Sequence, residues 1–279
     1  MKKFIAAFDG LKFSNSTKDY AIDIAKQSNT FPVGIFLDDV TYHSYKMYEL
    51  IADNGVLESR VERLEEKDKK TRDISAKKFE TACQEAGTNY SLHHDRSISL
   101  QELLHESIYA DLLIIDSKET LTHYEEEIPT RFIRDLLTEV QCPVLLVPQK
   151  YEPIKKIVLL FDGEPSSVHA IKMFSYILEP LKHLPAEVIT VKGMKKDRHV
   201  PDNKLMKEFM KRHYPKANFT VLQGLAEIEI PDYLKGNHGD ILIVLGAYRR
   251  GLVSRWFRES MADVLIKELK TPLFIAHNK

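Results

Sequence analysis

Phe4-Ile5-Ala6-Ala7-Phe8-Asp9-Gly10 opens the chain, and Ile157-Val158-Leu159-Leu160-Phe161-Asp162-Gly163 repeats the same pattern in its second half. In both places an apolar run ends in Asp-Gly, and small polar residues follow before a helical pattern begins. A continuous apolar run of this length is typical of a strand that is buried on both faces of a parallel sheet. The pattern therefore predicts one buried strand that occurs twice, at corresponding positions.

The ends of the two halves match as well. Residues 110–116 align with 239–245, and residues 142–147 align with 271–276 at the same spacing. The opening segments are spaced more widely, so the first copy holds additional residues in its middle. This pattern predicts a tandem duplication of one domain.

We predict domains at residues 1–149 and 154–279, joined by a short polar link that contains Pro153. A chain of 279 residues has room for two domains that each bury a core of their own. In each copy, apolar runs alternate with amphipathic helical patterns. The predicted fold class is therefore α/β, with two tandem five-stranded open parallel sheets that carry helices on both faces.

Composition narrows the choice of partners. Lys and Arg together number 40 against 41 for Asp and Glu, so no strong net charge favours nucleic acid or an anionic membrane. The start of the chain, Met1 to Phe4, runs directly into a strand pattern without a signal-peptide segment, and no stretch approaches membrane-spanning length. Cys83 and Cys142 are the only cysteines. We expect a cytoplasmic protein whose two thiols are ordinary reduced side chains.

The middle segments of the two sequence copies differ. Residues 54–87 form a dense charged helical pattern with thin apolar spacing, which predicts a solvated helix that buries only a narrow stripe. A partner-binding helix is the alternative. The second copy has a shorter helical pattern over 203–214, preceded by a basic segment at 192–199.

Ligands in a doubly wound sheet bind beyond the carboxyl ends of the strands, where the strand order reverses. In the second copy the residues at these ends include Asp162, Val191 and Gly246. The segment from Gly246 to Gly251 leads towards a helix that begins near Ser260, an arrangement that favours anion binding. Asp162 is suited to accept hydrogen bonds from a ribose or an adenine edge.

On these residues the chain resembles the universal stress protein family, which has an adenine nucleotide alpha hydrolase-like fold, over essentially its whole length. In nucleotide-binding members the loop runs Gly-x2-Gly-x9-Gly-[Ser/Thr] and cradles the phosphates of ATP. The resemblance places Gly246 on the first glycine, Arg249 on the second, Glu259 on the third and Ser260 on the hydroxyl. Two of the three glycines are missing, although Gly251 lies nearby.

The first copy departs further from this motif. Its corresponding positions are Ser117, Thr120, Thr130 and Arg131, without a glycine, and three glutamates stand at 125–127. Asp9 is kept. We expect no ATP binding of the family's kind in this copy, because close amide approach and a positive field are both missing.

Other patterns have simpler explanations. The adjacent His93, His94 and Asp95 do not predict a metal site, because neighbouring residues of a strand point to opposite faces. Ser14 and Ser166 are interpreted as helix caps rather than nucleophiles. The aromatic pair at 256–257 is interpreted as packing rather than base stacking.

Two classes of function stay open. The first is a stress-response or signalling protein that binds ATP or another adenine nucleotide in the second copy, through Asp162, Val191, Gly246, Arg249, Gly251 and Ser260. The second is an adaptor without a nucleotide, built from two degenerate domains, whose protein partner is unknown. Slow ATP hydrolysis is a weaker third alternative, because no general base or metal ligand set is visible.

The apolar segments 144–147 and 273–276 are predicted edge strands. An uncovered edge favours pairing, and a tandem copy supplies a partner at high effective concentration. We therefore expect the two copies to associate as an intramolecular pseudo-dimer, with homodimerisation as a further expectation. The resemblance implies dimerisation through the same region.

Overall fold

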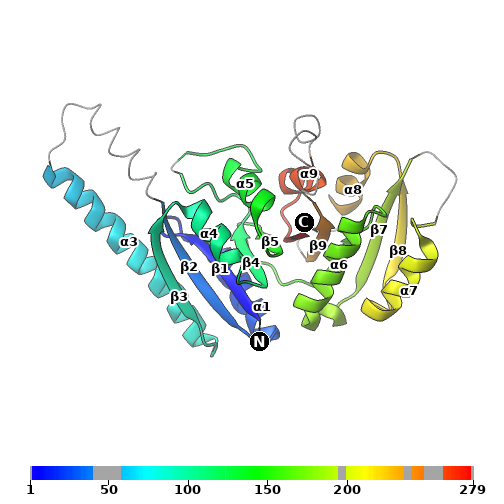
Figure 1. Cartoon of the computed structure of the whole chain (residues 1–279), viewed down its shortest axis with the longest axis horizontal. Helices are drawn as coiled ribbons and strands as arrows, with labels where there is room; N and C mark the ends of the chain where they lie inside the picture. The colour runs from blue at the N-terminus through cyan, green and yellow to red at the C-terminus, as the bar shows by residue number, and fades with distance from the viewer. Residues whose placement is uncertain are drawn as a thin grey trace. The chain divides into compact units, whose positions relative to one another are not determined.

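The computed structural model describes residues 2–39, 58–122, 124–193, 199–235, 240–247 and 260–277. The chain divides into two compact units, Met1–Cys142 and Pro143–Lys279. Both are α/β units in which strands and helices alternate along the chain (Figure 1). Among the described helices, none combines the length and the apolar character that crossing a bilayer requires.

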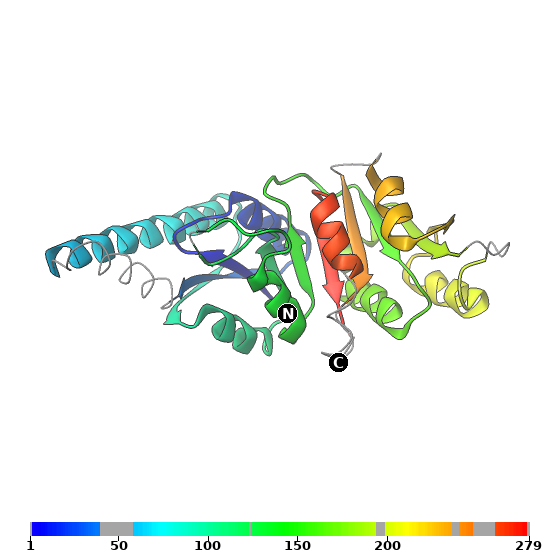
Figure 2. The ribbon, with the colours of Figure 1, turned by 90° about the horizontal axis from the view of Figure 1, so that it is seen from above.

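The first unit is a parallel sheet with the strand order β3-β2-β1-β4. Its described elements are β1 (Lys3–Asp9), α1 (Asn15–Gln27), β2 (Phe31–Asp39), α3 (Glu58–Glu85), β3 (Ser91–Ser97), α4 (Ser99–Ser107), β4 (Leu112–Asp116) and α5 (Arg131–Glu139). In Figure 2, α1 and α3 lie on one side of these strands, and α4 and α5 lie on the other. β1 and β4 are buried nearly throughout because each of their faces is covered by helices.

Helix α3 confirms the prediction of a charged helix with a narrow buried stripe. Among its residues whose burial is described, those below nine per cent exposure are Asp68, Ser75, Ala76, Phe79 and Cys83. The Phe79 ring packs edge-on against Phe8 of β1, with ring centroids 5.4 Å apart. One stripe of α3 is therefore anchored in the core, while the charged residues around it stay in solvent.

The second unit is a six-stranded sheet with the order β5-β10-β9-β6-β7-β8. Its described elements are β5 (Val144–Val147), β6 (Lys156–Leu160), α6 (Pro165–Ile177), the 3-10 helix η1 (Glu179–His183), β7 (Ala186–Lys192), α7 (Asn203–His213), β8 (Asn218–Gln223), α8 (Ala226–Lys235), β9 (Ile241–Gly246), α9 (Met261–Glu268) and β10 (Leu273–Ala276). All neighbours in it are parallel except β5 and β10.

The α/β fold with five strands in each sequence copy is confirmed, but the expectation of two separate five-stranded parallel sheets is wrong. β5 comes from the first copy, yet it pairs antiparallel with β10, the last strand of the second copy. All four residues of β5 are buried. Each of the two predicted edge strands therefore covers the other, which removes two open apolar edges at once.

The boundary between the compact units therefore falls between Cys142 and Pro143, before β5. The boundary between the two sequence copies falls after β5. The predicted domains 1–149 and 154–279 stay a prediction.

Candidate functional site: the strand-end crevices of the two units

The strand order reverses at corresponding points in both units. In the first unit this point lies between β1 and β4, and in the second it lies between β6 and β9. Because neighbouring strands here are parallel, their carboxyl ends share one edge of the sheet. We use the term crevice for the residues at this edge, since ligands of doubly wound folds bind there.

In the second unit, the strand register brings three of the predicted residues to the same edge. Leu160 pairs with Ile189, so Asp162 is level with Val191, the residue before the last of β7. Gly246 is the last residue of β9, next to the end of β6. The structure therefore gathers Asp162, Val191 and Gly246 as the sequence predicted, although their role towards a ligand stays a prediction.

Asp162 is exposed, and one of its carboxylate oxygens accepts a hydrogen bond of 2.9 Å from the main-chain N–H of Glu164. This bond fixes the turn after β6 and leaves further acceptor positions of the carboxylate available. Val191 is half-buried at the same level.

Gly246 makes a close main-chain approach to helix α6. A Cβ atom added to Gly246 would lie 2.4 Å from the carbonyl carbon and oxygen of Ser166 and 2.8 Å from the main-chain nitrogen of Ser167. The glycine is thus required by packing, whatever the crevice binds. Substitution of Gly246 would report on the fold first, so the residue is unsuitable as a test of phosphate binding.

The other predicted residues divide into two groups. Arg249 and Gly251 lie outside the described residues, as do the aromatic pair at 256–257 and most of the basic segment.

Ser260 is the N-cap of α9: its hydroxyl accepts a hydrogen bond of 3.1 Å from the N–H of Asp263, and the Asp263 carboxylate accepts one of 3.2 Å from the N–H of Ser260. This capping box places the chain's own carboxylate at the helix N-terminus, where a phosphate would otherwise be favoured.

The interpretation of two serines as caps is half right. The Ser14 hydroxyl caps α1, accepting a hydrogen bond of 3.2 Å from the N–H of Thr17. Ser166 lies inside α6, whose N-cap is Glu164, because Pro165 takes the first helical position.

The first unit fills its crevice with its own side chains. Asp9, the counterpart of Asp162, is only 7% exposed, and its carboxylate accepts a hydrogen bond of 2.8 Å from the N–H of Leu11. Burial raises the pKa of Asp9, although that hydrogen bond and the positive charges of Lys12 and Arg72 oppose the rise.

Arg72 of α3 covers the end of β1. Its guanidinium pairs with Asp38 of β2 at 2.7 Å, and a Cβ added to Gly10 would lie 2.9 Å from the Arg72 Cγ. The side chain therefore lies over the Asp-Gly turn, at the strand ends where ligands of doubly wound folds bind. Its ion pair holds it there, with both side chains mostly buried.

Glu119 is the second residue that fills this crevice. Its carboxylate accepts hydrogen bonds from the main-chain N–H groups of Thr120 and Leu121, at 3.0 and 2.9 Å. The side chain is 7% exposed. Burial, together with the negative charges of Asp9 and Asp116, raises the pKa of Glu119 to about 7. A carboxyl group of the protein thus accepts hydrogen bonds from amides that follow β4, where a phosphate-binding loop would offer its amides to the ligand.

Sequence reasoning missed Glu119 and Arg72. It named the run 125–127 as the acidic obstacle, but these glutamates are exposed, and Glu126 accepts a hydrogen bond of 2.8 Å from the N–H of Arg131. Of the positions aligned with the glycine loop, Thr130 is the N-cap of α5, and its hydroxyl donates to the Glu119 carbonyl at 2.5 Å. The one available signal was that Glu119 stands three residues after Asp116, in the corresponding loop.

The remaining candidates are two histidines with a neighbouring aspartate and two cysteines. Within the described ranges, no group of three or more His, Cys, Asp or Glu side chains is arranged to hold a metal ion. His93 lies 2.7 Å from the Glu106 carboxylate through Nδ1, while the side chains of His94 and Asp95 lie outside the description. Burial raises the pKa of both Cys83 and Cys142 to about 12, which disfavours the reactive thiolate.

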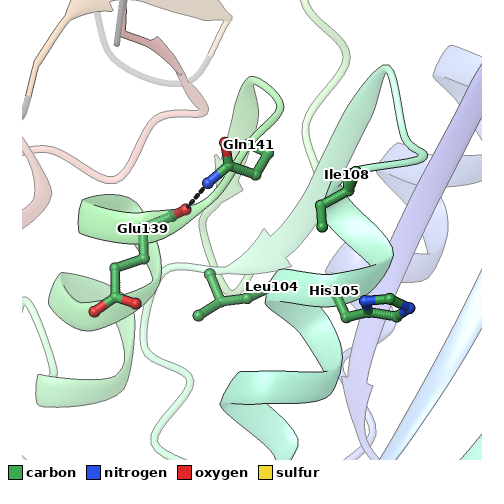
Figure 3. A pocket seen from close by; sticks show the side chains of 5 residues that line it. All are labelled: Leu104, His105, Ile108, Glu139 and Gln141. Carbon is green, nitrogen blue, oxygen red and sulfur yellow. Dashed lines mark hydrogen bonds between the residues drawn. The ribbon is translucent and has the colours of Figure 1, made fainter.

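The first unit also has an open hollow of ≈570 Å³ at its surface, lined by Leu104, His105, Ile108, Glu139 and Gln141. Figure 3 shows that these side chains come from the ends of α4 and α5, where the Gln141 side-chain nitrogen donates to the Glu139 main-chain oxygen at 2.7 Å. Both helices end at the amino-terminal edge of the strands. The hollow is therefore at the opposite edge from the crevice and contains none of the predicted site residues.

No protein-family model and no curated protein matches the chain. Solved structures do match it. A universal stress protein from Archaeoglobus fulgidus DSM 4304 has a TM-score of 0.71 at 10% identity, covering 99% of this chain and 98% of that one. A functionally unknown protein from Pseudomonas aeruginosa PAO1 has a TM-score of 0.58 at 13% identity, covering 99% and 92%.

A third structure, a putative universal stress protein from Pseudomonas aeruginosa UCBPP-PA14, has a TM-score of 0.57 at 15% identity, covering 99% and 93%. These identities establish a shared fold. The chain has the universal stress protein fold along its whole length, as the sequence resemblance implied.

Proposed function

We propose that the chain is a cytoplasmic stress-response or signalling protein that binds an adenine nucleotide only in its second unit. The shared fold with the Archaeoglobus universal stress protein supports the class, and the different crevices of the two units support the choice of unit. Binding, rather than rapid turnover, is the proposed activity.

The difference in exposure between Asp162 and Asp9 is the observation that favours the second unit as the nucleotide-binding one. Asp162 and Asp9 hold corresponding positions at the end of the first strand, but Asp162 is exposed and Asp9 is 7% exposed. Arg72 lies over the Asp-Gly turn of the first unit, and Glu119 is buried in the loop after β4. A ligand would have to displace an ion pair and a buried carboxylate there, whereas at Asp162 an acceptor already faces solvent.

Each residue of the proposed site has a distinct role. Asp162 accepts hydrogen bonds from the ribose or adenine, and Val191 supplies apolar contact to the base. Gly246 and Gly251 keep the main chain open to phosphate, and Arg249 adds a charge-assisted hydrogen bond. Ser260 marks the helix N-terminus towards which the phosphates point, and the Asp263 carboxylate would have to release the Ser260 N–H to a phosphate there.

The test is a titration with adenosine, AMP, ADP and ATP. Trp256 is the only tryptophan of the chain and lies between Gly246 and Ser260 in the sequence, so its fluorescence reports on this segment. Calorimetry on the same protein counts the sites. We expect one site, and Asp162→Asn should weaken binding about tenfold or more, because a charged acceptor is lost.

Two variants serve as controls. Asp232→Asn changes an exposed carboxylate of the same unit that pairs with Lys235 at 3.3 Å, and it should leave binding unchanged. Asp9→Asn changes the counterpart in the first unit and should also leave it unchanged. Two equivalent sites, or binding that depends on Asp9 and not on Asp162, would contradict the proposal.

An adaptor without a nucleotide is the second candidate, and a specific observation favours it. In both units one of the chain's own carboxylates, Glu119 or Asp263, accepts hydrogen bonds from main-chain amides near the position expected for phosphate. No binding at millimolar ATP, together with no nucleotide in a native mass spectrum of the purified protein, would select this candidate.

A further inference from the structure

We propose that the surface hollow between the ends of α4 and α5 binds an alkylammonium group, which is an unbranched aliphatic chain that ends in a protonated amine. The hollow has a volume of ≈570 Å³, and its lining residues are Leu104, His105, Ile108, Glu139 and Gln141 (Figure 3). Ligand pockets of proteins typically have volumes of about 300–1,000 Å³. The inference is independent of the nucleotide site proposed above, because that site belongs to the second unit.

The wall that α4 contributes to the hollow is apolar. Leu104 and Ile108 are four residues apart, so they lie one above the other on the same face of the helix. Ile108 is 58% exposed, and Leu104 is half-buried. An aliphatic chain that lies along both side chains would remove this apolar surface from water.

The side that α5 contributes is negatively charged. Glu139 is the last residue of α5, and the last turn of this helix, which the structure describes in full, has no Lys, Arg or His. A helix C-terminus already has a partial negative charge, so the Glu139 carboxylate adds to that charge and does not compensate it. The five described lining residues include no Lys or Arg. A cation is therefore the complementary partner for this side of the hollow.

Hydrogen bonds hold the two sides together. The N–H of Gln141 donates to the Ser107 hydroxyl at 3.0 Å, and that hydroxyl donates to the main-chain oxygen of Leu104 at 2.6 Å. The side-chain nitrogen of Gln141 donates to the main-chain oxygen of Glu139 at 2.7 Å, which leaves the side-chain oxygen of Gln141 as an acceptor. The segment after α5 is thereby fixed to the last turn of α4. Because these bonds form the hollow without a ligand, binding would require little ordering of the protein.

The arrangement fits a chain that has its charge at one end. In Figure 3 the Leu104 side chain points from α4 towards the Glu139 side chain of α5. An aliphatic stem on Ile108 and Leu104 would therefore place its ammonium group beside the Glu139 carboxylate. An anion would be repelled there. A metal ion would find one carboxylate beside an apolar wall, and the described residues hold no group of three or more metal ligands.

Methyl NMR spectroscopy of the full chain tests the proposal, with the Leu104 and Ile108 methyl resonances as reporters. The ligands are pentylamine, 1-pentanol, pentanoate and ammonium chloride, at constant ionic strength. Titrations at about pH 8 keep the alkylamine charged while an imidazole of ordinary pKa is neutral. We expect saturable shifts with pentylamine, about fivefold weaker binding of 1-pentanol, and no shifts with pentanoate or ammonium chloride.

Two variants separate the charged and the apolar contributions. Glu139→Gln should weaken pentylamine binding about fivefold, because the counter-charge is lost. Ile108→Ala should weaken it by a similar factor, because contacts with the aliphatic stem are lost. Each variant has a matched control that should not change binding: Glu127→Gln removes an exposed carboxylate of the same unit, and Ile74→Ala shortens an isoleucine of α3 that is 57% exposed.

The proposal is overturned if 1-pentanol binds as tightly as pentylamine, if Glu139→Gln leaves pentylamine binding unchanged, or if millimolar pentylamine gives no saturable shift. A short peptide with a single lysine between glycines distinguishes two sources of the same group. Tighter binding of this peptide than of pentylamine assigns the hollow to the lysine side chain of a partner protein, and weaker binding assigns it to a free alkylamine.

Discussion

Lys156 of β6 and Glu187 of β7 form an ion pair, with the lysine Nζ 2.5 Å from the carboxylate oxygen and the glutamate side chain 7% exposed. In the first unit, Lys3 of β1 holds the corresponding position and pairs with Glu106 at 2.6 Å. Glu187 comes from a strand, whereas Glu106 comes from helix α4. The two units have thus kept the ion pair while the carboxylate has changed its place in the chain.

Each carboxylate accepts further hydrogen bonds. Glu187 accepts the hydroxyls of Thr220 and Tyr233 at 2.5 and 2.7 Å, and Tyr233 belongs to α8, the helix that corresponds to α4. These donors make burial of the charge tolerable, because most of its lone pairs are satisfied. The cluster connects β6, β7, β8 and α8, and we infer that it contributes to the stability of the second unit.

Lys156→Met should destabilise the second unit by about 2 kcal/mol, because Glu187 would stay buried and lose its counter-charge. Urea unfolding measures this change. Lys155→Met is the matched control: Lys155 pairs with Asp240 at 2.9 Å, but both side chains are exposed, so the cost should be under about 0.5 kcal/mol. Equal costs for the two variants would refute a stabilising role of the cluster.

The same cluster predicts that the second unit loses stability in acid. Burial alone would raise the pKa of Glu187, but the bonds from Lys156, Thr220 and Tyr233 together hold it below its usual value. The stability that Glu187 contributes is therefore present above about pH 4.5 and is lost as the pH falls through the lowered pKa.

Accordingly, the stability difference between the natural chain and Glu187→Gln should shrink between pH 6 and 3 in urea unfolding. Glu208→Gln, an exposed change on α7, should show no such trend. A difference that stays constant, or that grows in acid, would mean that the charge of Glu187 does not stabilise the fold.

Gly246→Ala should destabilise the second unit by about 1–3 kcal/mol, because the added methyl group would meet the rigid main chain of Ser166. Gly193→Ala provides the comparison, since a Cβ there would have no neighbour within 4 Å among the residues that the structure describes, and its effect should be within about 0.5 kcal/mol. Urea midpoints of both variants, measured without ligand, decide the matter. An unchanged urea midpoint for Gly246→Ala would show that α6 shifts at little cost to accommodate the methyl group.

A fragment of residues 143–279 should be more stable than a fragment of 154–279, by about 3 kcal/mol or more. The longer fragment keeps β5, whose four buried apolar side chains lie alongside β10. The shorter one exposes the edge of β10. Urea unfolding of the two fragments at equal, low concentration measures the difference, and equal midpoints would show that β5 is dispensable for the second unit.

Much of the architecture was predictable because it follows from periodicity along the chain. The repeated apolar runs predicted five strands per copy, and the narrow apolar stripe in 54–87 predicted a helix that buries little. The gathering of Asp162, Val191 and Gly246 at one edge was also predictable, because residues at the carboxyl ends of parallel strands meet wherever the strands are neighbours.

Other features depend on which distant segments meet. β5 pairs with β10, which makes the second unit six-stranded. In the sequence both segments are equally apolar, so their composition does not show which strand each of them pairs with. Arg72 likewise reaches the end of β1 only because α3 packs across β2 and its guanidinium pairs with Asp38. Glu119 is buried because the N–H groups of the following residues donate hydrogen bonds to its carboxyl group. A charged residue in a loop pattern looks solvated; burial and its partners, which arise from tertiary packing, decide whether it fills a site instead.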